Sequence, residues 1–266
     1  MSRGALFLVG GKDGRNEDRV LIDRFARLCG GAAATVLVIT SASQEPERHR
    51  REYSAAFLES GVCRVSIFHA EGHAAAEDPE LLASLDRADG VYFTGGGQRR
   101  LVAAMGGTRF DERLRARHRE GLHIGGTSAG ASAMSAVMIA EGDGDAVELA
   151  TGFGLLEQII VDQHLRQRVR LSRLITAVLR NPAMLGFGLD EGTAVEIDAA
   201  GSAAVHGAGG LTIVDGSRLV DSRPVATDGS ARPLAFAGMR LHVLTEGWRY
   251  DLAAREAMPP GRESAG

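Results

Sequence analysis

One serine in this chain lies in the sequence context of a catalytic nucleophile. Ser128 is the central residue of G-T-S-A-G, residues 126–130, which fits the pattern G-x-S-x-G. A short apolar segment (121–124) precedes it and a run of small residues (132–138) follows, so we expect a strand, a tight turn and a helix. The hydroxyl would then project at a helix N-terminus, where backbone N–H groups stabilise a developing oxyanion. The alternative is a glycine-rich turn that only packs closely.

An activated serine needs a general base, and three histidines follow Ser128 in the chain: His164, His206 and His242. His164 comes directly after the apolar segment 158–162, at the same edge of the predicted sheet as Ser128. The other two lie inside β-like stretches of the late region. His164 is therefore the predicted base, although a single histidine is more often structural.

The base in turn needs an orienting acid, and Glu191 follows the apolar segment 184–189 at the same edge. Asp190 beside it competes for the same role, and either carboxylate could instead form a turn. The chain order Ser, His, Glu differs from the Ser, acid, His order of α/β-hydrolases. An α/β-hydrolase esterase with His242 as base is the alternative.

Three arginines follow His164 closely: Arg168, Arg170 and Arg173. At about 100° per residue, Arg170 and Arg173 would lie about 60° apart on a helix, while Arg168 would lie well away from Arg170. One interpretation is a solvated basic surface. The other is that some of these guanidinium groups bind a substrate carboxylate.

The elements that must position these residues alternate along the chain. Short apolar segments predict buried strands at 5–9, 35–40, 62–69, 90–94, 122–125, 158–162 and 184–189. Helical spacing predicts helices at 16–29, 46–60, 78–85, 111–120 and 165–180. This alternation favours an α/β fold with a mainly parallel sheet and helices on both faces, followed by antiparallel strands between 194 and 244.

Glycine-rich turns at Gly10, Gly95 and Gly125 follow strand ends, where ligands bind in open α/β sheets. The turn after Gly10 matches neither G-x-G-x-x-G nor a Walker motif, so we expect no dinucleotide or phosphate site there.

Composition bounds the remaining possibilities. The 266 residues are 44% hydrophobic, which suits one or two globular domains. No linker comes before the polar tail, so we expect one domain over 1–258 and a disordered tail over 259–266. A net charge of −4 makes nucleic acid a poor partner. Two cysteines, Cys29 and Cys63, lie in apolar surroundings, so we expect buried free thiols in a reducing compartment. We expect no metal and no cofactor. No signal peptide or membrane span is expected, so we predict a cytoplasmic protein.

Four motifs together resemble the cyanophycinase family, serine peptidases of the S51 type. They are F-T-G-G-G-Q at 93–98, G-T-S-A-G-A at 126–131, D-Q-H-L followed by three arginines at 162–174, and G-F-G-L-D-E-G-T-A at 186–194. The late segments 241–244 and 250–252 are also similar to the family. The matches run in order from about residue 5 to 252, nearly the whole chain.

The resemblance implies a fold like the class I glutamine amidotransferases (flavodoxin-like) and a homodimer. It implies a triad of Ser128 as nucleophile, His164 as base and Glu191 as orienting acid. The oxyanion donors would be the backbone N–H groups of Gly97 and Ala129. The substrate-binding residues would be Gln98, Arg168, Arg170 and Arg173.

The implied substrate is cyanophycin, a poly-aspartate chain with arginine on its side-chain carboxyls, released as β-Asp-Arg dipeptides. Its carboxylates suit basic residues, and its guanidinium groups need acidic partners such as Asp162 or Glu141. Gly97, Leu165 and Ser172 depart from the family pattern without removing a triad member. The alternatives are an aspartyl dipeptidase of the same superfamily and a non-catalytic ligand-binding relative.

Overall fold

A computed structural model of the chain describes residues 2–11, 17–144, 146–222 and 235–261. Of the tail for which we predicted disorder, residues 259–261 form a short irregular segment and a turn, and 262–266 lie outside the described residues. No helix among the described residues is both long and apolar enough to cross a membrane.

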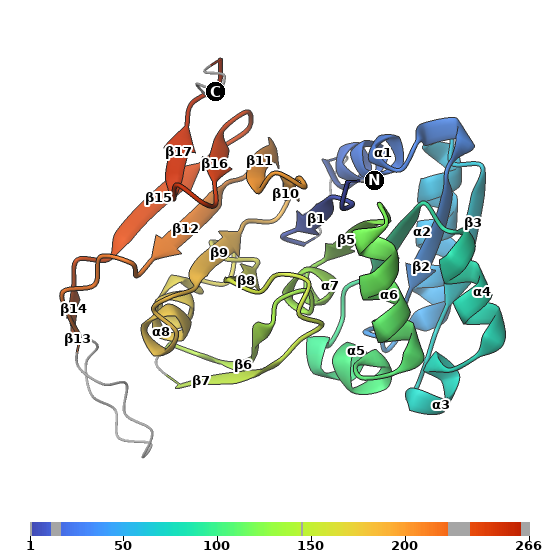
Figure 1. The fold of residues 1–266 in the computed structure, drawn as a ribbon, viewed down its shortest axis with the longest axis horizontal. Helices are drawn as coiled ribbons and strands as arrows, with labels where there is room; N and C mark the ends of the chain where they lie inside the picture. Colours follow the sequence, from blue (N-terminus) through green and yellow to red (C-terminus); the bar gives the residue numbers. More distant parts are fainter. Residues whose placement is uncertain (1, 12–16, 145, 223–234, 262–266) are drawn as a thin grey trace.

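A nine-stranded sheet runs through the molecule in the order β17-β16-β11-β10-β1-β5-β4-β2-β3 (Figure 1). The strands from β1 to β3 along this order pair in parallel: β1 (Leu6–Val9), β5 (His123–Thr127), β4 (Gly90–Phe93), β2 (Thr35–Ile39) and β3 (Arg64–Phe68). The remainder pair antiparallel: β10 (Thr193–Ile197), β11 (Ser202–Gly207), β16 (Arg249–Asp251) and β17 (Glu256–Met258).

A second, four-stranded sheet has the order β15-β12-β9-β8. It contains β8 (Ile159–Gln163), β9 (Leu185–Leu189), β12 (Leu211–Asp215) and β15 (Arg240–Leu244), of which β8 and β9 are parallel. The described residues also form two antiparallel strand pairs: β6 (Val137–Asp143) with β7 (Ala146–Thr151), and β13 (Asp221–Ser222) with β14 (Phe236–Ala237). The predicted α/β class, with late antiparallel strands, is confirmed.

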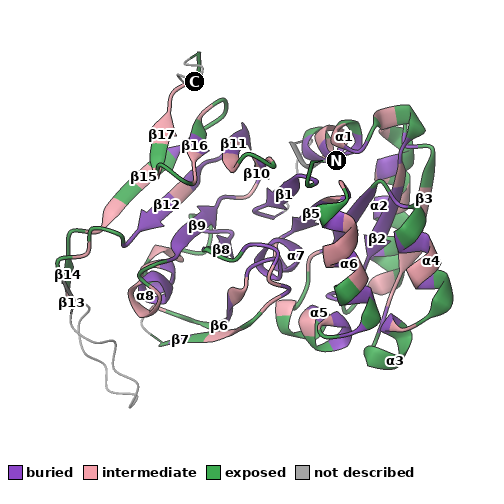
Figure 2. Cartoon of the chain, viewed as in Figure 1, coloured by how far each residue is buried: buried purple, intermediate pink, exposed green. Residues whose placement is uncertain are grey.

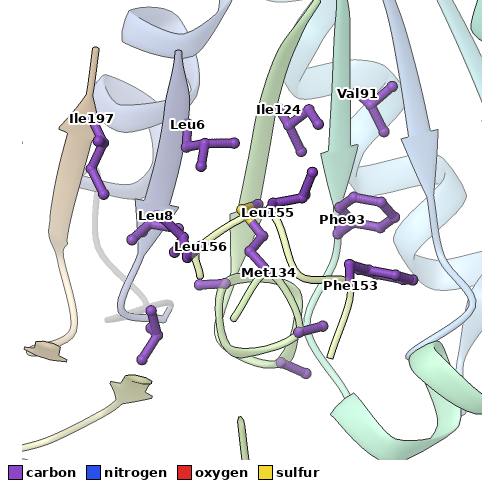
Figure 3. Close-up of a cluster of buried hydrophobic side chains, with 14 of the residues drawn as sticks. Leu6, Leu8, Val91, Phe93, Ile124, Met134, Phe153, Leu155, Leu156 and Ile197 are labelled. Atoms are coloured by element: carbon purple, nitrogen blue, oxygen red, sulfur yellow. The ribbon is translucent and has the colours of Figure 1, made fainter. Parts of the chain in front are cut away.

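Helices cover both faces of the large sheet because its strands are apolar on both sides. In β1, Leu6 and Leu8 face the cluster shown in Figure 3, and Phe7 and Val9 face the opposite cluster around Phe25. One face carries α1 (Glu17–Leu28) and α2 (Pro46–Glu59). The other carries α4 (Pro79–Arg87), α5 (Gln98–Met105) and α6 (Arg109–Arg119), with the short α3 (His73–Ala76) beside α5. Figure 2 shows the buried strands between these helices.

The helix predicted at 165–180 is shorter than expected, and α8 spans Leu171–Arg180. The chain from Leu165 to Arg170 forms turns, in which Val169 has a φ of 52° and the Arg170 N–H donates to Leu165 O. A left-handed residue interrupts a helix, so the regular structure begins only after it. Only Arg173 lies within α8, and Arg170 is its N-cap, so the helical spacing argument does not apply to the three arginines as a set.

The helix predicted at 132–138 is also wrong, because α7 covers only Ala129–Ser132 and β6 begins at Val137. The carbonyl oxygens of Ala133 and Met134 accept bonds from the loop at 153–156. Those oxygens are thus unavailable to continue the helix.

The two cysteines differ in exposure. Cys29 is buried, and burial raises the pKa of its thiol. Cys63 is exposed, so the prediction of two buried thiols is wrong for this residue, which precedes the edge strand β3.

Candidate active site

Ser128 stands at the sharp turn between β5 and α7. Its backbone has φ 52° and ψ −111°, an unfavourable conformation for a residue with a side chain, and its N–H donates to Val9 O at 2.9 Å. Gly130 must lack a side chain because a Cβ there would lie 2.4 Å from the carbonyl oxygen of Phe93. The motif glycine thus lets the helix begin directly against the neighbouring strand β4.

The side chains of Ser128, His164 and Glu191 form one hydrogen-bonded series. Ser128 Oγ lies 3.0 Å from His164 Nε2, and His164 Nδ1 lies 2.6 Å from Glu191 Oε1. Because a carboxylate can only accept, Nδ1 carries the proton and Nε2 is free to accept from the serine hydroxyl. The three residues come from the carboxyl ends of β5, β8 and β9, so both sheets contribute.

A glycine turn after β1 holds the imidazole in place. The His164 N–H donates to Gly10 O at 2.9 Å. Gly11, with a φ of 131°, faces the ring so closely that a Cβ would lie 2.2 Å from Cε1. Sequence reasoning only excluded a phosphate site here and missed this role.

Burial lowers the pKa of His164 below its ordinary value of 6.5, and the positive charge of Arg168 lowers it further. The hydrogen bond to Glu191 opposes this by raising it. The imidazole is therefore neutral at neutral pH, as a general base must be.

Asp190, the competitor for the acid role, points elsewhere. Its Oδ1 accepts the Arg166 N–H at 3.1 Å and its Oδ2 accepts the Gly210 N–H at 3.1 Å. The Asp190 carboxylate thus links the two loops that contain Arg166 and Gly210, and it forms no hydrogen bond with His164.

The two predicted oxyanion donors are not equivalent. Ala129 begins α7 directly after Ser128, where helix N–H groups lack intrahelical acceptors. The Gly97 N–H instead donates to Ala42 O at 2.9 Å, so it is occupied in this structure. Gly95 and Gly96 line the same pocket as Ser128.

The predicted substrate-binding residues differ in their contacts within the chain. Gln98 Nε2 donates to two carbonyl oxygens of β6, at 2.8 and 3.0 Å. Arg170 Nη1 donates to the backbone and side-chain oxygens of Gln163 at 2.9 and 2.7 Å. Arg168 is exposed, and it forms no ion pair with the described residues.

Arg173 is buried and cannot reach a substrate in this conformation. Its guanidinium binds both carboxylate oxygens of Asp162, at 2.7 Å for Nε, and donates to Gly142 O at 2.9 Å. Asp162 is fully buried. In this structure Asp162 and Arg173 are therefore occupied with each other, and the substrate-binding roles expected for them stay predictions.

The other two candidates for the base, His206 and His242, have different partners. His206 on β11 approaches Glu196 at 3.4 Å, and the His242 ring on β15 packs against Tyr250 with 5.5 Å between centroids. Neither forms a hydrogen bond with the serine.

Beside the triad is a pocket of about 760 Å³. Ser128 and His164 line it together with the charged residues Glu45, Arg48, Arg99, Arg100 and Glu141. Sequence reasoning named only Glu141 among these five. The others lie at or near the start of α2 and α5, which follow the carboxyl ends of β2 and β4, the edge where a ligand site is expected.

A nucleophile turn and a serine–histidine–carboxylate series on an α/β sheet define the class of serine hydrolases. Comparison with known proteins gives the family: residues 6–204 match peptidase family S51, and the chain belongs to it. It is a serine-type peptidase.

Several curated relatives carry the name cyanophycinase. The protein from Synechococcus elongatus is 38% identical, over 96% of this chain and 81% of its own length. Those from Trichormus variabilis and Geminocystis herdmanii are 36% and 33% identical, over 97% and 96% of this chain and 89% and 96% of their own lengths. A solved structure of a peptidase from an acI-B1 Actinobacterium superposes with a TM-score of 0.71 over 97% of both chains. At 18% identity, that likeness shows the fold alone.

Proposed function

We propose that this chain is a serine exopeptidase that hydrolyses cyanophycin to β-Asp-Arg dipeptides. The observation that carries the proposal is the series Ser128 Oγ, His164 Nε2 and Glu191 Oε1, joined at 3.0 and 2.6 Å beside an open pocket. The relatives named cyanophycinase support the choice of substrate.

In the first step, His164 Nε2 takes the proton of Ser128 as Oγ attacks the carbonyl carbon of an aspartyl backbone bond. The oxyanion is stabilised by the Ala129 N–H, with the Gly95–Gly96 backbone as the proposed second donor in place of Gly97. The C–N bond then breaks, and His164 gives the proton to the leaving amine. In the second step His164 activates a water, which hydrolyses the acyl-serine.

Incubation with insoluble cyanophycin granules and mass analysis of the soluble products tests this proposal. We expect β-Asp-Arg from the wild type and no soluble product from Ser128→Ala. Granules that stay intact with the wild type, under conditions where it is folded, would contradict the choice of substrate.

The aspartyl dipeptidase remains the second candidate, because the same series of residues would serve it. Soluble aspartyl dipeptides in the same assay distinguish it, since a dipeptidase cleaves them and leaves granules unchanged. Loss of activity in His164→Ala with retention in His242→Ala would exclude the esterase alternative.

The remaining expectations are tested separately. A non-catalytic ligand-binding relative would cleave neither substrate, and that alternative does not agree with membership of a peptidase family. The homodimer stays a prediction, tested by light scattering for a mass twice the 28.0 kDa of one chain. The cytoplasmic location stays a prediction as well.

A further inference from the structure

The charged side chains that line the pocket beside Ser128 do not all neutralise one another. Two ion pairs, at 3.1 and 2.8 Å, account for most of them: Glu45 with Arg48, and Arg99 with Glu148 of β7. The two that remain are Arg100 and Glu141. Among the described residues neither forms an ion pair, although Arg100 Nη1 donates to the Ser43 carbonyl oxygen at 3.2 Å. The pocket thus presents one cation and one anion to its contents.

Glu141 is held in place by its neighbours although its own carboxylate is exposed. It lies at a bulge of β6, where the register with β7 shifts between Ile139 and Glu141. Gln98 Nε2 donates to the two carbonyl oxygens that precede Glu141, and Arg173 Nη1 donates to the one that follows it. The backbone is therefore fixed on both sides of this carboxylate, which reduces the entropy lost when it binds a ligand.

We propose that Arg100 and Glu141 recognise a single arginine residue of the substrate. Arg100 would bind its α-carboxylate, and Glu141 would bind its guanidinium. This inference rests on the proposed function, because cyanophycin carries both groups on every arginine. A guanidinium and a carboxylate match in planar, charge-assisted pairs, so each contact selects its own group.

Gln98 and Arg173 then act as positioning residues for Glu141. Their hydrogen bonds end on the bulge and not in the pocket, so their effect on substrate passes through the carboxylate that the bulge presents. Truncation of Gln98 should accordingly raise KM for substrates with a guanidinium and have little effect on kcat.

The test uses three oligomers with the same poly-aspartate chain. One carries arginine, one carries citrulline, whose ureido group is neutral and similar in shape, and one carries argininamide, which lacks the α-carboxylate charge. For the wild type we expect kcat/KM to fall about 10-fold or more with each replacement. Glu141→Gln should bring the arginine-to-citrulline ratio close to one while it keeps the preference over argininamide. Arg100→Met should do the reverse.

Glu157→Gln is the matched control, because this exposed glutamate forms no ion pair among the described residues and does not line the pocket. It should keep both preferences. Gln98→Ala should lose the arginine-to-citrulline preference through KM, which a general loss of stability would not produce. Retention of the full wild-type preferences in Glu141→Gln and Arg100→Met would overturn the proposal.

Calorimetric binding to Ser128→Ala separates this inference from the proposed function. If the wild type cleaves none of the oligomers but Ser128→Ala binds β-Asp-Arg more tightly than β-Asp-citrulline, and Glu141→Gln removes that difference, the arginine site stands and the activity fails. If Ser128→Ala binds both dipeptides equally or neither, the arginine site is overturned.

Discussion

Ser128 combines the candidate nucleophile with one of the least favourable backbone conformations in the described chain. A residue with a side chain at φ 52° and ψ −111° costs about 1–3 kcal/mol, and the surrounding structure must supply that energy. The Ser128 N–H bond to Val9 and the close approach of Gly130 to β4 provide part of it. In this conformation the Ser128 hydroxyl lies 3.0 Å from His164 Nε2.

Two substitutions at Ser128 should separate chemistry from strain. We expect both Ser128→Ala and Ser128→Gly to lose about a thousandfold or more in kcat, since each removes the nucleophile. The free energy of unfolding of Ser128→Gly should exceed that of Ser128→Ala by about 1 kcal/mol, because glycine adopts this conformation readily. Chemical denaturation and peptidase assays measure the two effects, and a glycine variant less stable than the alanine variant would contradict the strain.

The two adjacent carboxylates should give different phenotypes. Glu191→Gln should lower kcat strongly, because the amide removes the charge that stabilises the imidazolium on His164. Asp190→Asn should keep most of the turnover and lose about 1 kcal/mol of stability, because its carboxylate accepts backbone N–H bonds from Arg166 and Gly210. Kinetics and thermal unfolding of both variants decide the assignment, which fails if Asp190→Asn loses more turnover.

The pH profile should depend on the charges around His164. Only the neutral imidazole accepts the serine proton, and burial lowers its pKa. Activity is therefore full above this lowered pKa and falls as pH drops through it, so the acidic limb should lie below 6.5, the ordinary value. Arg168→Gln removes a positive charge and should move the limb upward. Glu191→Gln removes the opposing contribution and should lower the His164 pKa further.

Activity assays and NMR titration of the His164 ring give the two measurements. An acidic limb that does not move in Arg168→Gln would show that this arginine is too well solvated to act on the base.

At the scale of elements, the turn after β1 packs directly against the imidazole ring of His164. The close approach of Gly11 to the His164 ring makes this turn specific for glycine. Gly30, with a φ of 114°, has a similar backbone requirement, but a Cβ there would meet nothing within 4 Å. The two glycines thus form a matched pair.

We expect Gly11→Ala to lose most of the turnover, because the added methyl displaces the imidazole from Ser128 by a distance that breaks the hydrogen bond. Gly30→Ala should cost about 1 kcal/mol of stability for its backbone and leave kcat unchanged. Steady-state kinetics and unfolding curves compare the two. Equal turnover in both variants would mean that the ring can relax away from the added methyl.

At the scale of the whole molecule, the Asp162–Arg173 pair joins separate parts of the fold. Asp162 belongs to β8, Arg173 to α8, and the third nitrogen of the guanidinium reaches Gly142 on the β6–β7 hairpin. Both charges are buried, so each depends on the other to offset its lost hydration.

Arg173→Ala should therefore destabilise the fold by about 3–5 kcal/mol, because the buried Asp162 carboxylate loses its two-point partner and, among the described residues, keeps only the Gln163 N–H at 2.8 Å and Arg170 at 4.0 Å. Arg168→Ala, at an exposed position, should change stability by less than about 0.5 kcal/mol. Denaturant titration measures both. The double change Asp162→Leu with Arg173→Met should recover much of the loss if the buried charge is its cause, and failure to recover would point to lost packing.

Local patterns in the sequence predicted the alternating strands and helices, and they selected the three residues that form the hydrogen-bonded series. Ser128, His164 and Glu191 each follow a short apolar strand, and the carboxyl ends of parallel strands gather at one edge of a sheet. The nucleophile turn required no long-range information, because its glycines and its serine are contiguous. Two predicted helices were wrong. Tertiary hydrogen bonds to Ala133 and Met134 end the helix after Ser132, and the left-handed conformation of Val169 delays the start of α8. Helical periodicity detects neither cause.

The roles of the charged residues were decided by tertiary structure alone. Arg173 and Asp162 both belong to the family motif at 162–174, from which we predicted substrate contacts. In the folded chain both are buried and form an ion pair with each other. Arg100 and Glu141 lie 41 positions apart in a chain with many charges, and nothing local distinguishes them. Whether a charge is free depends on which opposite charge lies within reach after folding. Sequence spacing sets the face of an element on which a residue lies, whereas the partner across a cleft is set by how the elements pack.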